Sequence, residues 1–322
     1  DYVLGVYAVL LLGDDRHTLT YDGRWRPKGR QRFFFPPRVA KARWTCNMTA
    51  ILYRGDAKRG RAWRSHFGRR LPDVEFRVWP EIGAVDDIRY LATWESMDKL
   101  EQRFPNLEVL FSTGAGVDQF DLAEIPPTID VVRLIDPAIV DGMREYVTMA
   151  VLLLQRQMID YMRARSRKRW QPLPPNMAAE VTVGIMGLGV LGHAVLDALK
   201  PFGFSLRAWS RRLRDVEGVD CFADASELYD FASGCNIVVC LLPLTDVTRG
   251  ILDRRMFQAM PRGASLVNVG RGGHLCEDDL LAALEEAQLS GAVLDVFDEE
   301  PLPTDHPFWA HERIVLTPHV AS

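Results

Sequence analysis

The chain has 322 residues, of which 48% are hydrophobic and 25% are charged, a composition typical of a globular protein long enough for two domains. The net charge of −4 gives no support for nucleic acid or an anionic membrane as a partner. Five cysteines are scattered, odd in number and without a C-x-x-C pair. This usage indicates reduced thiols in a cytoplasmic protein and no metal site.

The first 47 residues differ from the rest, because no sustained helical or strand period follows Leu12. The apolar stretch 2–12 is too short to span a bilayer and lacks the features of a signal peptide. A regular pattern begins after Met48. We therefore expect residues 1–47 to be a poorly structured extension and Met48 to be the true start.

From Met48 onward, strand-like runs alternate with charged helical segments, which predicts a parallel sheet covered on both faces. The expected strands of this first sheet are 50–53, 74–79, 90–94, 107–111 and 131–134. The loop 112–118 contains two glycines whose backbone N–H groups could hold a carboxylate, although a simple turn would have the same composition.

A long helix is expected over residues 141–156, where apolar residues fall on one stripe. The basic stretch 163–169 follows and leads into an arm, 170–175, that is either a linker or a contact with a second subunit.

The stretch 181–192 joins a short apolar strand to Gly187-x-Gly189-x-x-Gly192 and a helical pattern. This is the dinucleotide-binding fingerprint in its required context. Gly187 allows the tight turn, Gly189 lets the backbone approach a pyrophosphate, and Gly192 lets the helix pack closely on the strand. The N–H groups at the helix N-terminus would then face an anion.

The next predicted strand, 205–209, ends in Ser210, Arg211 and Arg212. NAD-binding chains place an acidic residue near this position to bind the ribose 2′-hydroxyl. A serine and two guanidinium groups suit a 2′-phosphate instead, although a solvated basic turn would look the same. The sequence therefore favours NADP(H) over NAD(H).

Further strands are expected at 236–242, 264–268, 291–296 and from Ile314 onward. Arg271, Glu300 and His319 each follow the carboxyl end of such a strand, where an open α/β sheet binds its ligand. Taken singly, Arg271 could be a surface charge, Glu300 a solvated loop acid and His319 a helix cap. Together they supply the cation, the carboxylate and the proton donor that carbonyl reduction needs.

These motifs together resemble the D-2-hydroxyacid dehydrogenase family. After the fingerprint the chain has Asn268-Val-Gly-Arg-Gly272, Leu294-Asp-Val-Phe-Asp-Glu-Glu-Pro301 and Thr317-Pro-His319, in the family's order. Gly114-Ala-Gly-Val-Asp118 is similar to the family's substrate-carboxylate loop. Trp94, the arm after Trp170 and the turn after Trp209 are most similar to the glyoxylate/hydroxypyruvate reductase branch.

The resemblance implies two Rossmann-like or flavodoxin-like doubly wound α/β domains with the active site in the cleft between them. Residues 48–143 would form the substrate domain and residues 144–322 the NAD(P)-binding domain. Family members continue past the position of Ser322 with a helix that returns to the first domain, so we expect the chain shown to lack that segment. A homodimer is also expected, because the family usually forms dimers through the second domain.

The resemblance also implies a role for each candidate site residue. Trp94, Ala115 and Gly116 would bind the substrate, and Arg271 would bind its carboxylate and polarise the keto oxygen. His319 would deliver the proton, with Glu300 bonded to its other ring nitrogen. The cofactor-binding residues would be Gly187, Gly189, Val190, Leu191, Gly192, Ser210, Arg211, Arg212, Leu242, Pro243 and Asp295.

The implied activity is NADPH-dependent reduction of small 2-oxoacids, glyoxylate to glycolate and hydroxypyruvate to D-glycerate. Formate dehydrogenase relatives resemble the chain less, because they carry Gln where this chain has Glu300. Phosphoglycerate dehydrogenase is an alternative, although its usual acidic residue after the second strand is missing here. A non-catalytic nucleotide-sensing scaffold could retain the same three polar residues, so the motifs leave that alternative open.

Overall fold

The computed structural model describes residues 49–114, 116–117, 119–122, 124–132 and 137–322. It divides the chain into two compact units, one ending at Pro137 and the other beginning at Ala138. Each unit is built on a parallel sheet, so the predicted class of two doubly wound α/β domains is confirmed. The expected extension, residues 1–47, lies outside the described residues. The boundary between the two units does not show what either unit binds. The expected substrate domain and NAD(P)-binding domain therefore stay predictions.

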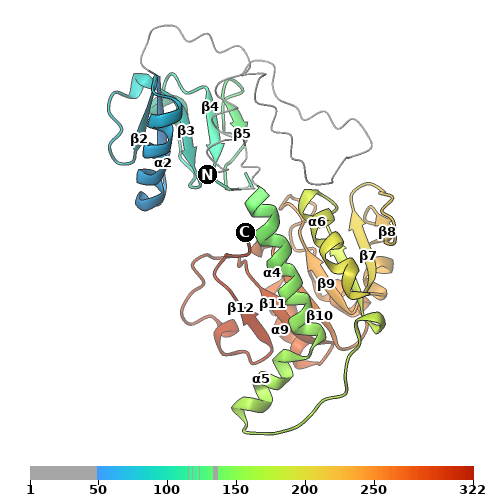
Figure 1. Ribbon diagram of the computed structural model, residues 1–322. Helices are drawn as coiled ribbons and strands as arrows, with labels where there is room; N and C mark the ends of the chain where they lie inside the picture. Colours follow the sequence, from blue (N-terminus) through green and yellow to red (C-terminus); the bar gives the residue numbers. More distant parts are fainter. Residues whose placement is uncertain (1–48, 115, 118, 123, 133–136) are drawn as a thin grey trace. The chain divides into compact units, whose positions relative to one another are not determined.

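The first unit has five parallel strands in the order β2-β1-β3-β4-β5, which is the flavodoxin-like arrangement. Asp56 caps its main helix, α2, by accepting a hydrogen bond from the Arg59 N–H at 2.7 Å. Its elements, drawn in blue to green in Figure 1, are β1 (Thr49–Arg54), α2 (Ala57–Arg70), β2 (Val74–Val78), η2 (Val85–Asp87), β3 (Ile88–Thr93), α3 (Leu100–Arg103), β4 (Val109–Ser112) and β5 (Asp130–Val132).

The second unit has seven parallel strands in the order β12-β11-β10-β9-β6-β7-β8. The chain runs outward from β6 through β7 and β8 and then returns to the other side of β6 with β9. An open α/β sheet binds its ligand at the carboxyl ends of the strands beside such a reversal. The loops after β6 and β9 are therefore where a ligand is expected.

The elements of this unit follow in chain order. They are α4 (Pro137–Gln155), α5 (Met158–Ser166), η3 (Ala178–Glu180), β6 (Thr182–Met186), α6 (Val190–Leu199), η4 (Lys200–Phe202), β7 (Ser205–Ser210), β8 (Asp220–Ala223), α7 (Leu228–Ser233), β9 (Ile237–Cys240), α8 (Arg254–Ala259), β10 (Ala264–Asn268), η5 (Gly272–His274), α9 (Glu277–Glu285), β11 (Leu289–Leu294), η6 (Pro307–Ala310) and β12 (Ile314–Leu316).

Helices cover both faces of the seven-stranded sheet (Figure 1). On one face, α4 and α6 pack on a core that includes Val183 and Ile185 of β6. On the other face, α7, α8 and α9 pack on a core that includes Met186. Strands buried on both faces need nearly continuous apolar sequence, which is the pattern that predicted them.

Several strands shift by one or two residues at their ends, and three differences are larger. Helix α4 begins at Pro137 rather than at residue 141. Helix α5 was not predicted and includes the start of the basic stretch 163–169; Ile159 is its buried residue, so it has no apolar stripe to reveal it. Strand β8 was not predicted, because it pairs only with β7 and its side chains are partly exposed.

Candidate active site

The loop that follows β6 carries the dinucleotide fingerprint. Gly187 has a φ of 110°, and a Cβ there would lie 2.9 Å from the carbonyl oxygen of Leu241, on the loop after β9. A Cβ at Gly192 would collide with the carbonyl oxygen of Gly187, so α6 can pack on β6 only because this position is glycine. A Cβ at Gly189 would meet no described atom within 4 Å. The open side of Gly189 leaves room for a ligand, which fits a pyrophosphate.

The first turn of α6 is suited to bind an anion. Gly189 is the N-cap of this helix, and its carbonyl accepts hydrogen bonds from the His193 N–H at 3.1 Å and the His193 ring Nδ1 at 2.8 Å. These bonds fix the peptide group between Gly189 and Val190, whose N–H belongs to the set without an intrahelical acceptor. Val190 is 61% exposed, and the positive end of the helix dipole lies here.

Strand β7 ends beside the fingerprint, because the carbonyl of Trp209 accepts a hydrogen bond from the Gly187 N–H at 2.8 Å. Ser210 is buried, and its hydroxyl donates to the carbonyl of Arg212 at 2.7 Å. Arg211 and Arg212 are exposed. The turn therefore presents two guanidinium groups to solvent next to the dinucleotide loop, a donor set that fits a phosphate.

The loop after β9 adjoins the fingerprint at the strand reversal. Leu242 is buried and Pro243 is exposed at its start. The Thr248 hydroxyl donates to the Pro243 carbonyl at 2.7 Å and accepts a hydrogen bond from the Thr245 N–H at 2.8 Å. These bonds close the turn and hold Leu242 and Pro243 as an apolar edge.

Arg271 is held by the turn that follows β10. The side chain of Asn268, which is fully buried, donates to the Arg271 carbonyl at 3.1 Å and accepts from the Gly270 N–H at 3.2 Å. The imidazole of His274, also fully buried, accepts from the Arg271 N–H at 3.0 Å. Two buried polar side chains thus fix the backbone that carries this guanidinium. The role of the His274 side chain could not be foreseen from the sequence.

Glu300 and His319 form a hydrogen-bonded ion pair between the loop after β11 and the turn after β12. Nδ1 of His319 lies 2.7 Å from Oε2 of Glu300, and Oε1 of Glu300 accepts from the Phe297 N–H at 2.9 Å. Because Nδ1 faces the carboxylate, a proton donated to a substrate would leave from Nε2.

The pKa of Glu300 depends on its burial, its hydrogen bonds and the charges around it. Partial burial raises the pKa of Glu300, but the hydrogen bonds from His319 and the Phe297 N–H lower it, and so do the charges of His319 and Arg271. The net result is a pKa below the ordinary value, so the carboxylate is ionised at neutral pH. The structure therefore brings Glu300 and His319 together, and Arg271 follows β10, the strand next to β11, with a charge that lowers the pKa of Glu300.

Asp295 follows β11 and is 1% exposed. Its carboxylate accepts hydrogen bonds from the Thr317 hydroxyl, the Val320 N–H and the Ala321 N–H at 2.5, 2.9 and 2.8 Å. These donors all come from the turn that carries His319, an arrangement that the sequence could not reveal.

The loop after β4 in the first unit contains Ala115 and Gly116, two of the residues expected to bind substrate, and Trp94, a third, directly follows β3. The Ser112 hydroxyl, which is buried, donates to the Gly116 carbonyl at 2.6 Å. The ring of Trp94 packs directly on Gly114, where a Cβ would collide with it. Ala115 lies outside the described residues, so nothing is said of its structure.

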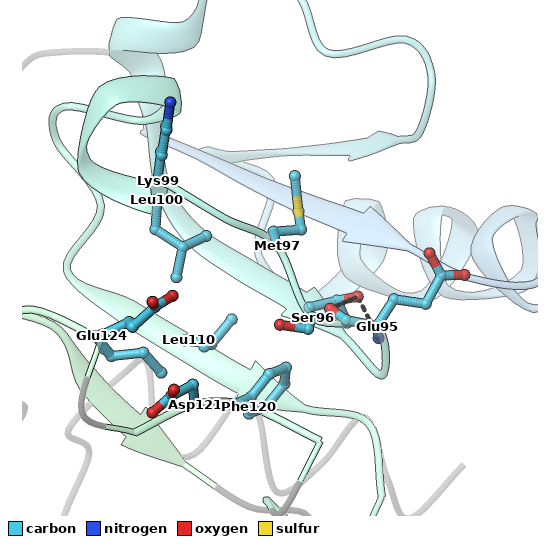
Figure 2. A pocket seen from close by; sticks show the side chains of 11 residues that line it. Glu95, Ser96, Met97, Lys99, Leu100, Leu110, Phe120, Asp121 and Glu124 are labelled. Atoms are coloured by element: carbon cyan, nitrogen blue, oxygen red, sulfur yellow. Dashed lines mark hydrogen bonds between the residues drawn. The ribbon is translucent and has the colours of Figure 1, made fainter. Parts of the chain in front are cut away.

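The first unit also has a small cavity, drawn in Figure 2. Its volume is about 30 Å³, enough for a water molecule but not for a 2-oxoacid. Glu95, Lys99, Asp121 and Glu124 are among the residues that line it. In the part of the chain that is described, no group of three or more His, Cys, Asp or Glu residues could hold a metal ion. Across the same residues, no helix is long and apolar enough to cross a membrane.

A doubly wound sheet with this fingerprint, and a histidine–glutamate pair at the carboxyl ends of its strands, is typical of nicotinamide-dependent oxidoreductases. Residues 148–321 match the model of the D-isomer specific 2-hydroxyacid dehydrogenase NAD-binding domain. The chain belongs to this family of dehydrogenases, as its motifs predicted.

Two curated relatives are each named glyoxylate/hydroxypyruvate reductase A. The protein from Yersinia enterocolitica is 39% identical over 266 residues, and the protein from Serratia proteamaculans is 38% identical over 266 residues. Each alignment covers 81% of this chain and 85% of the relative. The predicted similarity to this branch of the family is confirmed.

Solved structures agree with this placement. A 2-hydroxyacid dehydrogenase from Xanthobacter autotrophicus Py2, in complex with NADPH and MES, is 36% identical with a TM-score of 0.79. An NADPH-dependent glyoxylate/hydroxypyruvate reductase from Sinorhizobium meliloti, in complex with NADP and sulfate, is 36% identical with a TM-score of 0.77. Both comparisons cover 85% of this chain and 89% of the other.

Proposed function

We propose that this protein reduces small 2-oxoacids with NADPH, converting glyoxylate to glycolate and hydroxypyruvate to D-glycerate. The observation that carries the proposal is the 2.7 Å pair between His319 Nδ1 and Glu300 Oε2, with the charge of Arg271 acting on the same carboxylate. The names of the relatives from Yersinia, Serratia and Sinorhizobium support the choice of substrates.

The cofactor would be held by the fingerprint loop, the N-terminus of α6, and the Leu242–Pro243 edge, and it would supply a hydride when bound. Arg211 and Arg212 would bind the 2′-phosphate, because a guanidinium forms forked, charge-assisted hydrogen bonds with phosphate. The open side of Gly189 supports this assignment, since it leaves space for the pyrophosphate.

The chemistry of this chain's own residues follows from their charges. Arg271 would bind the substrate carboxylate and polarise the keto oxygen, with Trp94, Ala115 and Gly116 as the other substrate-binding residues. Reduction leaves negative charge on that oxygen, and His319 would transfer a proton to it from Nε2. Glu300, ionised at neutral pH, would stabilise the imidazolium form that donates.

The test is a steady-state assay of NADPH oxidation with glyoxylate, hydroxypyruvate, pyruvate and phosphohydroxypyruvate, repeated with NADH. We expect the highest kcat/KM with NADPH and either glyoxylate or hydroxypyruvate. His319→Ala is the control and should lower kcat by a factor on the order of 10²–10⁴. A preference for phosphohydroxypyruvate would support phosphoglycerate dehydrogenase activity instead, and no turnover of any of the four would contradict the proposal.

We also propose that the protein is a homodimer. Met149, Met158 and Met162 are 45%, 43% and 43% exposed and line an apolar groove on α4 and α5 together with Leu152 and Leu153. Exposed apolar surface of this kind marks an interface. Light scattering after size-exclusion chromatography should give the dimer mass, and Met149→Asp should give the monomer.

A cytoplasmic location is part of the same proposal. It is supported by Cys221, Cys235, Cys240 and Cys276, which the described part of the chain carries as free thiols. Fractionation of the producing cells would test it.

A further inference from the structure

Asp295 is a buried charge that the reduction chemistry does not use directly. Its side chain, 1% exposed, accepts three hydrogen bonds from the segment after β12: one from the Thr317 hydroxyl and one each from the N–H groups of Val320 and Ala321. Its backbone carbonyl accepts a fourth, from the His319 N–H at 2.8 Å. Asp295 therefore contacts the chain on both sides of His319.

His319 itself has an unusual backbone. Its φ is 53°, in the left-handed region that residues other than glycine seldom adopt. Such a conformation persists only where the surrounding structure over-determines it, and it is common at functional sites. The hydrogen bonds to Asp295 provide that restraint, since they fix the residues before and after His319.

Tyr146 of α4 also contributes to the restraint on the turn that carries His319. The hydroxyl of Tyr146 lies 2.5 Å from Oγ1 of Thr317, which itself donates to Asp295. Because the single hydroxyl proton of Thr317 is used on Asp295, Tyr146 must be the donor to Thr317. Tyr146, Thr317 and Asp295 thus form one directed chain of hydrogen bonds that ends on the carboxylate.

We propose that Asp295 is a positioning residue that holds the turn of residues 317–321 and so presents the imidazole of His319 to Glu300 and to the substrate. A buried carboxylate is costly unless its oxygens are satisfied, and here the side-chain donors all belong to that turn. The proposal rests on the proposed function, in which His319 is the proton donor. It adds a positioning role to the cofactor-binding role that the resemblance implies for Asp295.

Asp295→Asn is the direct test. The amide keeps one acceptor oxygen but presents an NH₂ group to a backbone or hydroxyl donor, so the turn loosens. We expect kcat to fall by about 10- to 100-fold, the effect of losing a hydrogen bond to a charged group. The dissociation constant for NADPH, measured by fluorescence titration, separates this loss of kcat from any change in cofactor binding. Weaker NADPH binding with unchanged kcat would overturn the proposal.

Thr317 offers a milder, matched pair of variants. Thr317→Val keeps the shape but removes the hydroxyl, and we expect a lower kcat; Thr317→Ser restores the hydroxyl and should restore the rate. In a His319→Ala background, Thr317→Val should have no further effect on kcat, because the hydroxyl acts through His319. An additive loss in the double variant would show a general structural role and contradict the proposal.

Hydrogen exchange separates this proposal from the proposed function. Mass spectrometry of the peptide that contains residues 317–321 should show faster amide exchange in Asp295→Asn than in wild type, because the Val320 and Ala321 amides bond to different oxygens and one of them loses its acceptor. This readout needs no turnover, so it tests the restraint even if no 2-oxoacid is reduced. Unchanged exchange would refute the restraint itself.

Discussion

Replacing Glu300 with glutamine removes one charge from the site while keeping the size of the side chain. Oε1 of Glu300 accepts from the Phe297 N–H at 2.9 Å, and Oε2 bonds with Nδ1 of His319 at 2.7 Å. A glutamine amide has one oxygen and one NH₂ group, so it can accept from one of these donors and must present N–H to the other. The imidazolium form of His319 therefore loses stabilisation.

The size of the effect follows from the hydrogen bond and its exposure. A hydrogen bond to a charged group contributes about 1.5–3 kcal/mol when it is shielded from water. The side chains of His319 and Glu300 are 33% and 35% exposed, so screening reduces the contribution to roughly 1–1.5 kcal/mol. Since about 1.4 kcal/mol corresponds to a factor of ten, kcat/KM for glyoxylate at neutral pH should fall about tenfold.

The pH profile should change in a defined direction. Partial burial raises the pKa of Glu300, but its bonds to His319 and Phe297 and the nearby positive charges bring it below the ordinary 4.5. The ion pair therefore stabilises the protein above pH 4.5 and is lost as the pH falls through the depressed pKa. Wild type should keep activity to below pH 4.5 on the acid side, whereas Glu300→Gln has no carboxyl to titrate there.

The assay is a series of initial rates with glyoxylate at saturating NADPH across the pH range. Glu299→Gln is the matched control, because it removes the same charge from an exposed neighbouring position. The acid limb that depends on the Glu300 carboxyl should be absent from Glu300→Gln and stay in place in Glu299→Gln. Identical profiles for the two variants would refute the coupling of Glu300 to proton transfer.

Three further predictions concern the cofactor, the substrate and the fold. Replacing Arg211 and Arg212 together with Ala should raise KM for NADPH far more than for NADH; equal increases would remove these arginines from phosphate binding. Arg271→Lys keeps the positive charge but loses the paired N–H donors of the planar guanidinium, so kcat/KM should fall by about tenfold or more. A fully active lysine variant would show that these paired donors are not needed. Gly192→Ala should lower the free energy of unfolding in urea by about 1–3 kcal/mol, because its Cβ collides with backbone. Gly189→Ala should leave unfolding almost unchanged and weaken NADPH binding, since a Cβ there meets only open space; equal stability of the two alanine variants would contradict this interpretation.

The sheets could be predicted because a strand that is buried on both faces requires a nearly continuous apolar run in the sequence. Strands such as β6 and β9 are almost wholly apolar, and a glycine or proline follows each of them within three residues. Helix α5 and strand β8 have no such apolar run, since few of their side chains are buried. In both cases tertiary contacts, and not local pattern, decide the secondary structure.

The contact between Glu300 and His319 was predictable for a topological reason, and the same reason predicts Arg271 at this edge of the sheet. In a parallel sheet the carboxyl ends of all strands lie on one edge, so polar residues that follow different strands converge there without any contact being visible in the sequence. Only the order of the strands had to be correct, and β10, β11 and β12 are indeed neighbours.

The restraint on His319 could not be predicted, because its cause is distant in the chain. Thr317, Pro318 and His319 contain no glycine or asparagine to signal a left-handed residue, yet His319 adopts a φ of 53°. That conformation is favourable only after Asp295 has been buried with its oxygens facing the turn. Burial of Asp295 in turn requires β11 and β12 to be paired, so the imidazole gains its orientation only when the sheet is complete. The geometry needed for proton donation is therefore a consequence of folding, and no local segment encodes it alone.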